Sequence, residues 1–273
     1  AERLGNPVTL ARCLNYLRAA AWSRVTAAEQ ESLSARIVEL AVEHDEPIIE
    51  LQGRVWLVCD ALERGDDPAT VEAILVPLRQ LVERLRLPQY RWYLELHRSC
   101  RALLDGDPDL AEQAALRALE VGSGMGDLNV ELAFGAATYL VAHERGRTGE
   151  LVELAAEQVE RFPGLLAWRA VLAQTLAARG DRCGATQALL SALADLPDAP
   201  TDPLRPATLA LLIDVAQRLA DVHAAEALYA LLAPYAGPAA FAVVYPPYAL
   251  DPDHALQIGH KTHRAAPCVE CHG

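Results

Sequence analysis

Short breaks centred on glycine recur along the chain at intervals of about forty residues. The segments LERGD, LLDGD, HERGR and AARGD place Gly65, Gly106, Gly146 and Gly180 at spacings of 41, 40 and 34 residues, and RLADV puts Ala220 in the equivalent place 40 residues further on. Each break separates two apolar stretches of helical period. Glycine suits the left-handed residue that ends a helix, and an Asp or Thr just after it can cap the next helix. The spacing therefore predicts repeated pairs of helices.

About two helices fit within each interval. Clusters such as HDEP, RLPQ, RFPG and LPDAPTDP separate one pair from the next, because proline removes a backbone donor and glycine frees the backbone. One helical hairpin cannot cover its own apolar face, whereas hairpins stacked in register can. The sequence therefore predicts an all-α solenoid of about six hairpins. The expected helices lie near residues 7–22, 26–44, 47–64, 68–86, 89–105, 108–122, 128–145, 148–161, 164–179, 182–195, 204–220 and 222–235.

Composition supports a helical interaction protein. The chain is 52% hydrophobic but only 5% aromatic, and alanine and leucine dominate, which favours helix. Within one expected helix, Leu110, Ala114, Leu116 and Leu119 are placed to share an inward stripe. No apolar run is long enough to span a bilayer. A net charge of −13 argues against nucleic acid as a partner, because a phosphate-binding face needs clustered cations.

Four cysteines lie within the expected helices, namely Cys13, Cys59, Cys100 and Cys183. They form no evident disulfide framework, and we expect them to be buried thiols. His97 and Cys100 share a helix face, but two ligands are too few for a metal site. The pattern GSGMGD follows a helix rather than a strand, so it predicts a loop between repeats and not a dinucleotide site.

No catalytic constellation is evident, and we expect the chain not to be an enzyme. Glu150, Glu153 and Glu157 lie at helical spacing, which indicates a solvated acidic face rather than acid–base catalysis. The segment QYRWYLELHR begins a helix with three aromatic rings, Tyr90, Trp92 and Tyr93. Such rings can line the groove where solenoids bind partners. The alternative is that they pack in the core.

Three segments resemble a known family: LPQYRWYLELHRSCRALLDGDPDLAEQAALRALEVG, ERFPGLLAWRAVLAQTLAARGD and LALLIDVAQRLADVHAAEALYALLAPYAG. They are similar to the tetratricopeptide-like (TPR-like) repeats of large bacterial signalling ATPases, which often also carry a helix-turn-helix or a nucleotide cyclase domain. The resemblance covers about residues 1–237. It implies a cytoplasmic sensory or protein-docking arm of a signalling or transcriptional regulator. The family's G-x-x-x-x-G-K-[ST] motif is absent, and the pattern changes after PYAG.

Residues 238–273 form an expected irregular tail that ends in HKTHRAAPCVECHG. Cys-x-x-Cys-His is a haem attachment signature. The thiols of Cys268 and Cys271 can bond to the two vinyl groups of a haem c, and His272 then ligates the iron. His260 and His263 are available as the sixth ligand. The order H-x-x-H-x-x-x-x-C-x-x-C-H resembles the entry to multihaem cytochromes c of the class III kind, which implies that the two early histidines are distal ligands.

Two alternatives to haem remain open for the tail. Cys268, Cys271 and two of His260, His263 and His272 are a suitable tetrahedral set for zinc. The tail could also hold no site at all.

The sequence thus predicts a non-catalytic scaffold that binds a protein or an effector in a repeat groove. The alternative is an electron-transfer protein with one covalent haem and a redox partner, and a small zinc site is the second alternative. The regulator resemblance implies the cytoplasm, whereas covalent haem attachment implies a periplasmic or extracellular location.

Overall fold

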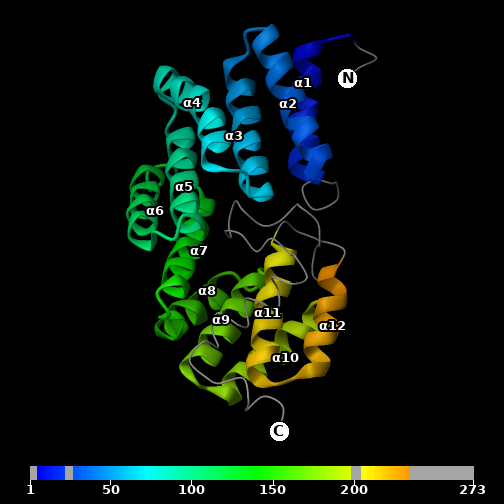
Figure 1. Ribbon diagram of the computed structural model, residues 1–273, viewed down its shortest axis with the longest axis vertical. Helices are drawn as coiled ribbons and strands as arrows, with labels where there is room; N and C mark the ends of the chain where they lie inside the picture. Colours follow the sequence, from blue (N-terminus) through cyan, green and yellow to red (C-terminus); the bar gives the residue numbers. More distant parts are fainter. Residues whose placement is uncertain (1–4, 22–26, 198–203, 234–273) are drawn as a thin grey trace. The chain divides into compact units, whose positions relative to one another are not determined.

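The structure, a computed structural model, describes residues 5–21, 27–197 and 204–233 (Figure 1). This part of the chain contains twelve α-helices and one 3₁₀ helix, and it contains no strand. The predicted all-α, repeat-like fold class is confirmed. The irregular tail predicted over residues 238–273 lies outside the described residues.

The helix bounds agree closely with the expected ones. Most differ by no more than two residues; α12 ends at Leu232, and the eighth expected helix begins as the 3₁₀ helix η2. The helices are α1 (Pro7–Ala21), α2 (Ala27–Glu43), α3 (Pro47–Arg64), α4 (Pro68–Leu85), α5 (Pro88–Leu104), α6 (Pro108–Gly122), α7 (Leu128–Glu144), η2 (Thr148–Leu151), α8 (Val152–Arg161), α9 (Leu166–Arg179), α10 (Arg182–Asp195), α11 (Arg205–Leu219) and α12 (Val222–Leu232).

All five predicted breaks reverse the chain through a left-handed residue. The φ angles are 70° at Gly65, 76° at Gly106, 68° at Gly146, 86° at Gly180 and 61° at Ala220. The residue after the left-handed one donates a backbone hydrogen bond that closes the end of the helix. The Asp181 N–H donates to the Leu176 carbonyl at 3.0 Å, and the Asp221 N–H donates to the Ala216 carbonyl at 2.9 Å. These bonds satisfy carbonyls that the helix itself leaves without partners.

Aspartates start the second helix after four of these breaks. Each N-cap side chain accepts a hydrogen bond from a backbone N–H of the first turn, which stabilises the helix start. The four caps are Asp67, Asp107, Asp181 and Asp221. The break at Gly146 has no side-chain cap, and the chain there enters η2 before α8. The tighter i→i+3 bonding of a 3₁₀ turn suits an uncapped helix start.

The described helices divide into two compact units at Arg145/Gly146, inside the region expected as one repeat domain. In the first unit α5 packs against α6, α6 against α7, and α1 against α2 and α3. In the second unit α9 packs against α8, α10 and α11, and α11 packs against α12. Contacts of α5 with α7 and of α9 with α11 show that first helices of neighbouring hairpins also touch within each unit.

Small residues let α5 and α6 approach closely. The Oγ of Ser99 on α5 donates a hydrogen bond to the Ala111 carbonyl at 2.9 Å, which requires near contact of the two backbones. The expected inward position of Leu116 is wrong, because its side chain is 51% exposed. The buried stripe of α6 is displaced around the helix and consists of alanines: Ala111, Ala114, Ala115 and Ala118.

A buried ion pair joins the first three helices. Arg18 on α1 donates from Nη2 to Asp60 Oδ1 on α3 at 2.5 Å, and the two side chains are almost completely buried. The guanidinium also donates from Nε to Ser34 Oγ on α2 at 3.3 Å and lies 4.7 Å from the Trp56 ring. Breaking such a pair would strand a charge in the core. The pair therefore fixes the register of α1, α2 and α3.

Surface ion pairs connect neighbouring hairpins within each unit. In each case an arginine at the C-terminal end of a first helix meets an acid in the opening turns of the preceding second helix. Positive charge at a helix C-terminus and negative charge at an N-terminus both interact favourably with the helix dipole. The pairs are Arg64–Glu31 at 3.1 Å, Arg145 with Asp109 at 2.5 Å and with Glu112 at 2.8 Å, and Arg179–Glu153 at 2.6 Å.

Ala220 provides a direct test of the turn chemistry, because it is an L-residue in a left-handed conformation. We expect Ala220→Gly to raise the free energy of unfolding by about 1 kcal/mol, since glycine adopts this conformation without steric cost. The matched control is Gly180→Ala, which adds a Cβ into open space and should lower stability by about 1 kcal/mol. Urea unfolding curves of the two variants measure both effects. Shifts of the same sign would contradict the assignment.

Candidate partner-binding pocket

The tail candidates lie outside the described residues. These are Cys268, Cys271 and His272 of the haem attachment motif, and the possible axial ligands His260 and His263. The zinc alternative uses the same five residues. Haem and zinc binding therefore remain predictions from sequence.

Two of the three aromatic groove candidates lie in the core instead. Tyr90 and Trp92 are only 6% and 4% exposed, so neither ring is available to a partner. Trp92 packs with Ala118 and Val130, and its ring centroid lies 4.8 Å from that of Tyr93. Tyr93 is partly buried, and burial raises its pKa to about 12. The packing alternative therefore holds for Tyr90 and Trp92.

The helical cysteines divide into two kinds. Cys59 and Cys100 are buried, as expected, and burial raises the pKa of Cys100 to about 12. Cys13 and Cys183 are exposed, so the expectation of burial is wrong for these two. The apolar stripes of α1 and α10 run along other faces of those helices. Across the described ranges, no cluster of three His, Cys, Asp or Glu side chains is arranged to hold a metal.

His97 is a buried histidine. It is 2% exposed, and neither of its ring nitrogens has a hydrogen-bond partner. Its ring stacks on Tyr93 with the centroids 6.4 Å apart. Burial lowers the pKa of His97 to about 4, so the ring is neutral near pH 7.

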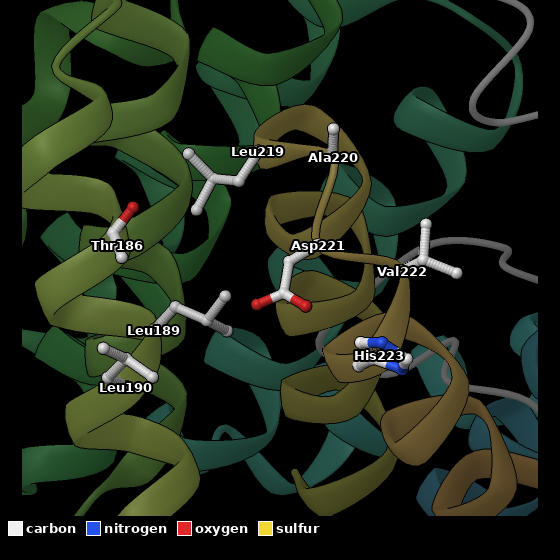
Figure 2. A pocket seen from close by; sticks show the side chains of 8 residues that line it. All are labelled: Thr186, Leu189, Leu190, Leu219, Ala220, Asp221, Val222 and His223. Atoms are coloured by element: carbon white, nitrogen blue, oxygen red, sulfur yellow. The ribbon is translucent and has the colours of Figure 1, made fainter. Parts of the chain in front are cut away.

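A surface pocket of the second unit lies between α10 and the turn that joins α11 to α12 (Figure 2). This pocket has a volume of about 530 Å³. Its walls come from the first turns of α10, the end of α11, the turn itself and the start of α12. The lining residues are Thr186, Leu189, Leu190, Leu219, Ala220, Asp221, Val222 and His223.

Hydrogen bonds between side chains and backbone groups hold the walls of the pocket in place. Arg182, at the start of α10, donates to the carbonyls of Arg218 at 3.2 Å and Leu219 at 2.9 Å. These carbonyls lie at the end of α11, where the helix cannot satisfy them itself. On the other wall, Asp221 Oδ1 accepts a hydrogen bond from the Ala224 N–H at 3.0 Å. The pocket is therefore supported on both sides before any ligand arrives.

The pocket presents exposed apolar groups beside one carboxylate. Leu190 and Val222 are 57% and 63% exposed, whereas Leu189 in the same lining is buried. Figure 2 shows the Asp221 carboxylate turned into the space between α10 and the turn. Leucine and valine attract apolar side chains, and a carboxylate favours a cationic or N–H group at the rim. The arrangement therefore suits a group that has both an apolar part and a cationic part.

Sequence reasoning did not identify this pocket. Leu190 and Val222 belong to different hairpins, and only the stacking of α10 beside the α11–α12 turn brings them together. One signal was present: Val222 directly follows the capping Asp221, at a helix position that is usually exposed. A large apolar residue at such a position is unusual enough to mark a candidate contact surface.

No protein-family model matches the chain, and no curated protein matches it. Within the described ranges, every helix is too short or too polar to cross a lipid bilayer.

His97 makes stability depend on pH. The unfolded chain protonates this histidine below about pH 6.5, whereas the folded chain keeps it neutral down to about pH 4. The unfolded state therefore binds more protons in this window, and the free energy of unfolding should fall as pH is lowered. The loss attributable to His97 is about 2 kcal/mol between pH 6.5 and pH 5.

Urea unfolding at several pH values measures this dependence. His97→Leu should flatten the slope between pH 6.5 and pH 5, because the titrating group is gone. The matched control, His44→Leu, changes an exposed histidine and should keep the wild-type slope. Equal slopes in wild type and His97→Leu would contradict the prediction.

Proposed function

We propose that the chain is a non-catalytic helical-repeat scaffold that binds a protein partner through the pocket between α10 and the α11–α12 turn. The observation that carries the proposal is the exposure of Leu190 and Val222 on opposite walls of a supported pocket. The resemblance of residues 1–237 to TPR-like repeats supports a place within a larger signalling regulator. In such a regulator the scaffold would receive an effector or dock a second protein.

The pocket favours a short peptide segment with an apolar anchor and a nearby basic residue. Full burial of a leucine or valine side chain contributes about 1.5–3 kcal/mol, and Leu190 and Val222 are each a little over half exposed. The two residues together would then contribute about 2 kcal/mol to binding. The Asp221 carboxylate would add orientation, because a cation at the rim can reach it while the apolar anchor fills the pocket.

A peptide-display selection against the full chain tests this proposal. The expected outcome is enrichment of peptides with apolar anchors, whose affinity is then measured by fluorescence anisotropy. Val222→Asp should weaken their binding at least tenfold, because it places a charge in the apolar wall. The matched control is Leu116→Asp, which changes an apolar residue of the first unit that is 51% exposed, against 63% for Val222, and should leave binding unchanged. Peptides that bind Val222→Asp as tightly as wild type would contradict the proposal.

We also propose a second candidate function, electron transfer by a covalently attached haem c. The observation that favours it is the order of His260, His263, Cys268, Cys271 and His272 in the sequence. Two thiols and a histidine at this spacing match the chemistry of haem attachment. In this case the helical repeats would dock a redox partner, and the chain would lie outside the cytoplasm. A zinc site built from the same residues is the remaining alternative.

Expression with a cytochrome c maturation system distinguishes these alternatives. Covalent haem should give a Soret band that survives acid–acetone extraction, and Cys268→Ala with Cys271→Ala should abolish the band without changing the helical circular dichroism. The control is Cys13→Ala with Cys183→Ala, which removes the two exposed helical thiols and should keep the band. A colourless protein that holds one equivalent of zinc would contradict haem and favour the metal site.

A further inference from the structure

The first unit carries a group of exposed arginines whose side chains have no partner. Elsewhere in the described residues an arginine side chain usually forms an ion pair, a hydrogen bond to a carbonyl or a ring contact, as Arg101 does with Asp105 and Arg161 with Phe162. Within the described ranges, the arginine side chains without such a partner are those of Arg12, Arg84, Arg86, Arg91 and Arg98. All of these except Arg12 lie close together in the sequence, where α4 ends and α5 begins.

Little negative charge accompanies these arginines. Glu95 is the sole acidic residue between positions 84 and 104, and its carboxylate pairs with Arg117 on α6 at 3.2 Å. Glu83 directly precedes Arg84 and lowers the net charge there. The first turn of α5 contains no acid and has no side-chain cap. Although the whole chain has a net charge of −13, this part of its surface is therefore positively charged.

Arg91 and Arg98 share one face of α5. They lie seven residues apart, which is nearly two turns, so about 10 Å separates them along the helix axis. Arg86 lies in the two-residue connection that precedes α5, in a left-handed conformation with φ 53°. We call Arg86, Arg91 and Arg98, all of them exposed, the arginine strip. The neighbours of Arg98 in the sequence, His97 and Ser99, are buried, so a firmly packed helix presents the strip.

The chemistry of the strip favours carboxylates. A guanidinium binds a carboxylate through two parallel hydrogen bonds. In an extended segment, carboxylates three residues apart are separated by about 10 Å, which matches the spacing of Arg91 and Arg98. Nucleic acid fits less well, because three cations neutralise few phosphates and the net charge of −13 repels a long polyanion. An acidic protein segment is therefore the occupant that fits the strip best.

We propose that the arginine strip binds an acidic segment of a partner protein. Two carboxylates of the segment pair with Arg91 and Arg98, and a further acid pairs with Arg86. The strip belongs to the first unit and shares no residue with the pocket between α10 and the α11–α12 turn. The pocket favours an apolar anchor beside a basic residue, so the two surfaces select segments of opposite charge.

Fluorescence anisotropy with the full chain tests this proposal. The probe is a labelled short peptide with glutamate at every third position and serine and glycine between. In about 20 mM NaCl, where surface charges are weakly screened, the peptide should bind. Arg91→Glu with Arg98→Glu should weaken this binding at least tenfold, because both pairing cations become anions. An unchanged affinity would overturn the proposal.

A matched control separates the strip from the overall charge of the chain. Arg12→Glu with Arg36→Glu makes the same change in net charge on exposed arginines of α1 and α2. This control should change the affinity for the acidic peptide less than twofold. Because all four arginines are exposed, both double variants should keep the helical circular dichroism of the wild type. Equal weakening by the two variants would show a general charge effect and overturn the proposal.

Two further measurements identify the occupant and the site. A single-stranded oligonucleotide with the same charge as the peptide should bind more weakly than the peptide. Tighter oligonucleotide binding that Arg91→Glu with Arg98→Glu abolishes would assign the strip to nucleic acid and overturn the proposal. Val222→Asp should leave the acidic peptide bound, and Arg91→Glu with Arg98→Glu should leave apolar-anchored peptides bound. Failure of the strip and failure of the pocket therefore give different results.

Discussion

The hairpins of this protein depend on one backbone conformation, the left-handed residue at which each first helix ends. At Gly65, Gly106, Gly146, Gly180 and Ala220 the chain leaves the helix in the same way, and the bonds that close the helix end use the next one or two residues. After four of these breaks an aspartate then begins the following helix within two residues. Because the reversal is so short, the second helix must return beside the first. The apolar stripes of the two helices are therefore brought to face each other by local turn chemistry.

Packing between helices then uses both small and charged residues. Alanines on α6 allow Ser99 of α5 to reach the Ala111 carbonyl, which a stripe of leucines would have prevented. Between α1 and α3, helices of neighbouring hairpins, the buried Arg18–Asp60 ion pair takes the place of apolar packing. Such a pair contributes little net stability compared with apolar packing, yet misalignment would leave each charge without its partner. It therefore specifies which helices are neighbours more than it stabilises them.

Sequence reasoning predicted the helices and their ends well, because glycine, proline and aspartate act locally on the backbone. It was less successful with the direction of individual side chains. Leu116 was expected inside and is exposed, whereas Tyr90 and Trp92 were candidates for a surface and are buried. Helical spacing determines which residues share a face, but several faces of an alanine- and leucine-rich helix are apolar enough to point inward. The pocket depends on two hairpins at once, so no single segment of sequence predicts it.

The arginine–carboxylate pairs between hairpins give each unit a polarity. In each of these pairs the arginine lies on the edge that faces the preceding hairpin, and the carboxylate lies on the edge that faces the next hairpin. Arg145 pairs in this way with Asp109 and Glu112, and Arg179 pairs with Glu153. If two hairpins faced each other with the same kind of edge, arginine would lie against arginine or carboxylate against carboxylate. Within each unit these pairs therefore favour one direction of hairpin stacking over its reverse.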